Sequence, residues 1–89
     1  MNKHPRHWKG LRVETPAIYK IRVQGHLDAG WADEMGGMQI TTERMEDETD
    51  VTTLVGRIAD QAALTGIINA LYGMQLPVLT VECLEADDS

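Results

Sequence analysis

The stretch that decides the fold is DQAALTGIINALYG, residues 60–73. Its large apolar side chains recur at the spacing i, i+3, i+4 and i+7, which places them on one face of an α-helix. These residues are Leu64, Ile67, Ile68 and Leu71. The segment therefore predicts an amphipathic helix whose apolar face packs against a second layer of structure.

Both ends of this helix carry residues that helix termini favour. The carboxylate of Asp60 can accept a hydrogen bond from an exposed N–H group of the first turn. Gly73 stands at the C-terminal end, where a left-handed residue is favoured and glycine adopts that conformation without strain. Gly66 lies in the middle of the helix and costs stability relative to alanine. We interpret it as a site of close backbone packing against a sheet.

Four further segments have the composition of β-strands. Apolar and polar residues alternate in them, or β-branched residues dominate, as is typical of half-buried strands. The segments are 17–24, 38–43, 51–58 and 77–83. A polar turn at 44–50 joins the second to the third, so these two are expected to form an antiparallel hairpin. Pro77 opens the last strand, a position that fits the edge of a sheet.

A short helix of about two turns is expected between the first two strands. Asp28 stands at an N-cap position before it. Trp31 and Met35 are four residues apart, so they would share one face of this helix. The pair Gly36 and Gly37 is expected to stop it, because glycine accepts the left-handed conformation.

The expected order is strand, short helix, strand, strand, long helix, strand. This βαββαβ order predicts an α+β, ferredoxin-like two-layer sandwich, in which a four-stranded antiparallel sheet carries both helices on one face. The first and third strands are then central, and the second and fourth are edges. If residues 28–37 form a loop instead, the result is a four-stranded, meander-like sheet backed by one helix. The single domain is expected to span 17–85, between an N-terminal arm at 1–16 and an acidic end at 86–89.

The two faces of the predicted sheet differ in composition. The face turned toward the helices is expected to carry Tyr19, Ile21, Val23, Met38, Ile40, Leu54, Ile58, Leu79 and Val81. The opposite face is expected to carry Lys20, Arg22, Gln39, Thr41, Thr53, Val55, Arg57, Thr80 and Glu82. This second face lacks the aromatic residues on which RNA-binding sheets stack bases, which argues against RNA recognition.

Three basic residues on the second face are candidates for a small-ligand site. They are Lys20, Arg22 and Arg57. Together they can hold a carboxylate or a phosphate, and Trp31 is a further candidate ligand-binding residue. Glu43 and Glu82 on the edge strands offer internal ion pairs as the alternative. A second sheet or a partner chain packing over the apolar residues of this face is the third possibility.

Charge divides the 89-residue chain unevenly. Residues 1–13 contain four basic residues and no acid, whereas four basic and fourteen acidic residues follow from Glu14 onward. The net charge of −6 argues against nucleic acid or an anionic membrane as the main partner. We expect residues 1–16 to be a mobile arm, either solvated or held weakly on the acidic body. The alternative is weak nucleic-acid contact through this arm, with Trp8 stacking on a base.

Few residues are arranged for catalysis. The sequence contains no phosphate-binding loop, dinucleotide fingerprint, nucleophile elbow or Cys-x-x-Cys pair. His26 and Asp28, beside Trp31, are candidates for a general base and its partner, although helix capping by Asp28 explains that residue more simply. No metal or cofactor site is predicted, because the acidic turn at 46–50 lacks calcium-loop spacing and the body lacks a second histidine. Cys83 is expected to be a small buried hydrophobe.

Two motifs stand out in the order of the predicted elements. A Gly-His-Leu-Asp segment followed by tryptophan lies in VQGHLDAGWADEMGGMQIT (23–41), and an Ala-Asp-Gln-Ala-Ala-Leu helix lies in GRIADQAALTGIINALYGMQLPVLTVE (56–82). In these motifs the chain resembles a family of short uncharacterised bacterial proteins. The resemblance covers most of 17–85, supports the fold and implies no established activity, substrate or catalytic residue. The basic arm and the long acidic turn depart from the family pattern.

Together these observations favour a non-enzymatic protein-interaction or small-ligand-sensing module that associates with itself or with another protein. A small domain with one thin core gains stability when its second sheet face is covered. The alternatives are a small enzyme using His26 and Asp28 beside Trp31, and nucleic-acid contact through the arm. A single cysteine suits a reducing compartment, so the cytoplasm is the expected location. No apolar run approaches the roughly 20 residues that span a bilayer, so no membrane association is expected.

Overall fold

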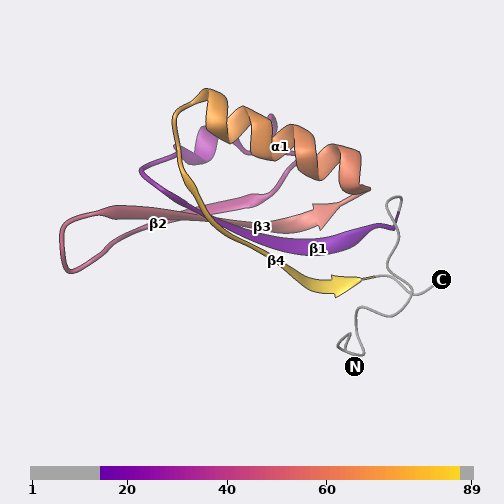
Figure 1. The fold of residues 1–89 in the computed structure, drawn as a ribbon, viewed down its shortest axis with the longest axis horizontal. Helices are drawn as coiled ribbons and strands as arrows, with labels where there is room; N and C mark the ends of the chain where they lie inside the picture. The colour runs from indigo at the N-terminus through magenta and orange to yellow at the C-terminus, as the bar shows by residue number, and fades with distance from the viewer. Residues whose placement is uncertain (1–14, 87–89) are drawn as a thin grey trace.

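The computed structural model describes residues 15–86, in which a four-stranded antiparallel sheet carries one α-helix on one face (Figure 1). The elements are β1 (Ala17–Gln24), the 3-10 helix η2 (Ala29–Trp31), β2 (Gln39–Arg44), β3 (Asp50–Ile58), α1 (Gln61–Gly73) and β4 (Val78–Ala86). The predicted α+β class is therefore confirmed. Residues 1–14 of the predicted arm and residues 87–89 of the predicted acidic end lie outside the described residues.

Strand β1 lies inside the sheet, and its side chains show which sheet face is buried. Its residues alternate along the strand between buried and more exposed, as the two-residue period requires. The buried ones are Ala17, Tyr19, Ile21 and Val23. β1 pairs with β3 and with β4, and the strand order is β2-β3-β1-β4. The prediction that the first and third strands are central and the other two are edges is confirmed.

The prediction of a two-turn helix between β1 and β2 is wrong, so the elements do not follow the ferredoxin-like βαββαβ order. Only the three residues Ala29–Trp31 form a 3-10 helix, and the carboxylate of Asp28 makes no capping hydrogen bond. Met35 is fully buried while Trp31 is 43% exposed, so the two do not share a helical face. So short a helix, weakened by Gly30, is marginal on its own. The structure matches the alternative in which residues 28–37 form no full helix and one helix backs the four-stranded sheet. Its strand order, however, is not that of a meander.

The long helix α1 forms as its apolar spacing predicts. Its buried residues are Leu64, Ile67 and Leu71. Ile68 is partly buried and packs against the core. At the N-terminus, Oδ1 of Asp60 accepts a hydrogen bond from the backbone N–H of Ala63 at 2.8 Å, which confirms the predicted cap. The apolar face of α1 therefore packs on the sheet, and together they enclose the core.

The helix C-terminus differs from the prediction by two residues. Gly73 is the last helical residue and does not take the left-handed conformation, which falls instead to Gln75 with a φ of 63°. The backbone N–H of Leu76 then donates to the carbonyl of Leu71 at 3.0 Å, and that of Gln75 donates to Tyr72 at 2.8 Å. These two bonds define a Schellman end, with the buried Leu76 completing its apolar contact.

Close backbone packing occurs at a different glycine from the one predicted. Gly66 is exposed, and a Cβ added there would meet nothing within 4 Å, so the interpretation of Gly66 as a packing site is wrong. On β3, a Cβ at Gly56 would lie 3.0 Å from the Cα of Met38. Gly56 faces Tyr19 across β1 and β3, on the helix-facing side of the sheet. The close approach therefore lies between the sheet and the chain entering β2.

The edge strand β4 departs from simple alternation. Its pairing with β1 shifts register twice, which leaves Leu79 and Leu84 as extra residues without a partner in β1. Such bulges change which way the neighbouring side chains point. Leu79, Val81 and Leu84 are 48%, 42% and 41% exposed. Val81 lies opposite the buried Ile21, on the predicted helix-facing side, although it stays exposed. Leu79 has no partner in β1, so its predicted place in the alternation is wrong.

Candidate functional site

The three predicted basic residues share the uncovered face, defined as the sheet face opposite α1. Lys20 and Arg22 occupy alternate positions of β1, and Arg57 lies on β3 diagonally from Lys20. Glu82 is directly opposite Lys20 on β4, the arrangement of a cross-strand charge pair. Glu43 lies on β2, separated from β1 by β3. The predicted placement of the basic residues on one face is confirmed, with one of the two predicted acidic neighbours beside them.

The predicted catalytic candidates lie in the loop between β1 and β2. His26 and Asp28 are exposed, and Trp31 is 43% exposed. None of the three lines the hollow described next. The structure therefore places these residues in one loop without enclosing them around a substrate-sized space.

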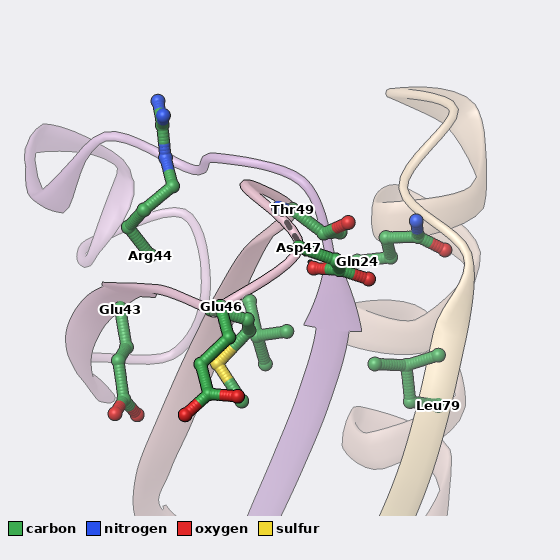
Figure 2. Close-up of a pocket in the computed structure, with 9 residues that line it drawn as sticks. Gln24, Glu43, Arg44, Glu46, Asp47, Thr49 and Leu79 are labelled. Atoms are coloured by element: carbon green, nitrogen blue, oxygen red, sulfur yellow. Dashed lines mark hydrogen bonds between the residues drawn. The ribbon is translucent and has the colours of Figure 1, made fainter.

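A hollow of about 670 Å³ lies at the end of the uncovered face (Figure 2). Its lining residues are Gln24, Glu43, Arg44, Met45, Glu46, Asp47, Thr49, Val51 and Leu79. Glu43, Val51 and Gln24 are side by side in the register of β2, β3 and β1, and the bulged Leu79 lies on β4 between the partners of Val23 and Arg22. The turn 45–49 forms the remaining wall. Sequence reasoning missed this hollow, because only the folded register brings the four strands and the turn together.

The lining combines an apolar floor with acidic side chains. Leu79, at 48% exposure, supplies apolar surface beside the buried Val51, while Glu43, Glu46 and Asp47 are exposed carboxylates. The remaining charged residue, Arg44, is engaged by Asp50, whose Oδ1 lies 2.9 Å from its Nε. Figure 2 shows the guanidinium of Arg44 directed away from the carboxylates of Glu43 and Glu46. The hollow therefore favours a ligand that is cationic and partly apolar.

The turn that walls the hollow is held by its own hydrogen bonds. The backbone N–H of Met45 donates to the carbonyl of Thr49 at 2.8 Å, and the N–H of Thr49 donates to Oδ1 of Asp47 at 3.0 Å. The bonds from Thr49 lower the pKa of Asp47 below its usual 3.8, because they favour the carboxylate form. Glu48 takes a φ of 67° at the tip. Asp47 therefore stays ionised at neutral pH.

Thr52 is a buried polar residue that sequence reasoning also missed. Its hydroxyl donates to the carbonyl of Gly25 at 2.6 Å and accepts from the N–H of Leu27 at 3.1 Å. It also lies 3.0 Å from the hydroxyl of Thr42 on β2. Thr52 thus fixes the loop that carries His26 to the sheet. The available signal was a threonine at an inward-facing position of a strand otherwise lined by apolar residues.

Within residues 15–86, no three His, Cys, Asp or Glu side chains are grouped so that they can hold a metal ion. In the same range, no helix has the length and apolar character needed to cross a membrane.

Comparison with known proteins gives one family. A family model described as a domain of unknown function (DUF8691) matches residues 18–82, which include most of the sheet, α1 and all the residues of the hollow. No curated protein and no solved structure matches the chain. The match agrees with the resemblance of the two sequence motifs to an uncharacterised family.

Proposed function

The chain belongs to the DUF8691 family, and we propose that it is a non-enzymatic protein-interaction module that pairs with a second copy of itself through β4. The observation that carries this proposal is the exposed apolar edge of the sheet. Leu79, Val81 and Leu84 are each more than 40% exposed on this one strand. An edge strand also offers unpaired backbone N–H and C=O groups to another chain.

The two edges of the sheet differ in a way that favours β4. β2 has six residues, QITTER, of which only Ile40 is buried, and its end is occupied by the pair of Arg44 and Asp50. β4 has nine residues, VLTVECLEA, with neither proline nor a basic residue among them. Natural proteins use charge, proline and short length to blunt sheet edges. β4 has no proline and is the longer edge strand, and its two bulges leave the stretch 80–83 between them regular, which supports this stretch as the pairing edge.

Self-pairing has a register that avoids like charges. In an antiparallel pair with a two-fold axis at Val81, Glu82 faces Thr80 of the second copy and Leu79 faces Cys83. A pair centred on Glu82 would instead set the two glutamates against each other, which is unfavourable. The Val81 register buries apolar side chains without opposing charges, and the two-fold axis makes both halves identical. We place this pairing in the cytoplasm, where a single buried thiol such as Cys83 stays reduced.

Sedimentation velocity over a micromolar concentration range tests the proposal. We expect the wild-type chain to form a dimer and Val81→Lys to be a monomer, because a lysine on each side of the axis opposes pairing. Tyr72→Lys is the matched control, since Tyr72 is an apolar residue that is 58% exposed on α1 and does not belong to β4. A wild-type chain that is monomeric at every concentration contradicts self-association. A Val81→Lys variant that remains a dimer contradicts the role of β4.

A further inference from the structure

The hollow combines features that suit an extended basic segment. Its floor is apolar at Val51 and Leu79, and its rim carries the carboxylates of Glu43, Glu46 and Asp47. Of the basic residues on the uncovered face, Arg22 occupies the row next to the hollow, and Lys20 and Arg57 lie farther along the sheet, so the carboxylates are concentrated at this end. A segment bearing both positive charge and a large apolar side chain would match both parts of the lining.

The first thirteen residues of the chain have this chemistry. They contain Lys3, Arg6, Lys9 and Arg12 and no acidic residue. Trp8 lies among these bases and can cover apolar surface with its indole ring. In contrast, the described residues 15–86 contain eleven acidic and four basic residues. The two parts of the chain are therefore complementary in charge.

The length of this segment suits an intrachain contact. The described residues begin at Thr15, next to Ala17 at the end of β1 that is remote from Gln24. At about 3.3 Å per residue, these two ends of β1 are roughly 23 Å apart. About seven extended residues cover that distance. A segment that folds back from Thr15 thus has residues 1–8 left to enter the hollow.

We propose that the N-terminal basic segment of the same chain, residues 1–13, docks in the hollow, where its positive charges match the rim carboxylates and its tryptophan matches the apolar surface at Leu79. The contact is an intramolecular, salt-sensitive association between the two oppositely charged parts of the chain. It covers one end of the uncovered face and part of the apolar surface at Leu79.

Acrylamide quenching of Trp8 fluorescence tests this docking in the full-length chain. The chain has two tryptophans, and Trp31→Phe leaves Trp8 as the only emitter without disturbing the core, because Trp31 is exposed. At low salt we expect Trp8 to be quenched less than in a free peptide of residues 1–13. The protection should disappear at about 1 M salt, where screening reduces the Debye length to about 3 Å.

A pair of charge-matched variants assigns the contact to the hollow. In the Trp31→Phe background, Glu43→Gln with Glu46→Gln should abolish the protection of Trp8. Asp33→Asn with Glu34→Gln removes the same charge outside the hollow and should retain it. Equal quenching of Trp8 in the chain and in the free peptide, or equal loss in both variants, overturns the proposal. Protection that increases with protein concentration overturns the intrachain assignment, and the measurement at low concentration does not depend on whether β4 pairs.

Discussion

At the scale of single residues, the hydroxyl of Thr52 joins three parts of the chain. Thr52→Val keeps the size and shape of the side chain but leaves the buried N–H of Leu27 without an acceptor. A buried unsatisfied group of this kind costs about 1–3 kcal/mol. We expect the free energy of unfolding in urea to fall by that amount.

Thr53→Val is the control for this measurement, because Thr53 is half-buried on the uncovered face. A surface substitution of this type changes stability by about 0.5 kcal/mol or less. Equal effects of Thr52→Val and Thr53→Val would contradict the assigned role of the Thr52 hydroxyl.

The basic residues show how far single positions can be predicted. Lys20, Arg22 and Arg57 were placed on one face from alternation alone, because a central strand keeps its two-residue period. Leu79 was misplaced, because a bulge depends on how β4 registers with β1, which the residues of β4 do not encode locally.

At the scale of elements, alanine substitution of one glycine in α1 and of one in β3 should change stability in opposite directions. Gly66→Ala adds a Cβ in open space on the exposed side of α1, so it should stabilise the protein by about 0.5–1 kcal/mol through helix propensity. Gly56→Ala forces a Cβ against the Cα of Met38, so it should destabilise the protein.

Thermal unfolding followed by circular dichroism measures both changes. The expected order of midpoint temperatures is Gly66→Ala, wild type, Gly56→Ala. A lower midpoint for Gly66→Ala would restore the interpretation of that glycine as a packing site.

The sequence predicted the N-terminal end of α1 correctly but not its C-terminal end, and the difference has a physical reason. Asp60 was predicted as a cap because its carboxylate acts within the first turn. The left-handed residue at the other end is Gln75, not Gly73, because the buried Leu76 must reach back to Leu71 and so sets where the helix stops. The short helix before β2 failed because burial of Met35 against the core outweighs weak local helix propensity.

At the scale of the whole molecule, stability should fall at alkaline pH. Burial raises the pKa of Cys83 above its usual 9.0, and burial, together with the neighbouring Cys83, raises the pKa of Tyr19 above its usual 10.0. These two residues face each other across β1 and β4. The folded state therefore keeps protons that the unfolded state releases, and the free energy of unfolding decreases as pH rises above about 9.

Urea titrations between pH about 7 and about 11 measure this decrease. Cys83→Ala should remove the part of the decline that begins nearest the usual thiol pKa, and reduce without abolishing the part due to Tyr19, because burial is the larger cause of the raised Tyr19 pKa. A free energy of unfolding that stays constant across this range would contradict the assignment.

The sheet order was predicted as a whole, while the candidate site was not. Strand order follows from the number of alternating segments and from the right-handed connections between them. The hollow depends on where the turn 45–49 lies relative to β4, and this is a property of the assembled sheet. Sequence patterns reveal which residues are acidic or apolar, but not that these residues share one space.

The two bulges of β4 also limit how far the protein can assemble. They interrupt the free edge on both sides of Thr80, Val81, Glu82 and Cys83, the four residues between Leu79 and Leu84. A strand added there finds only this short regular stretch, so growth by successive strand addition has no continuous template. In the proposed pair, the polar β2 is the free edge at either end, which disfavours the growth of a fibril from the pair.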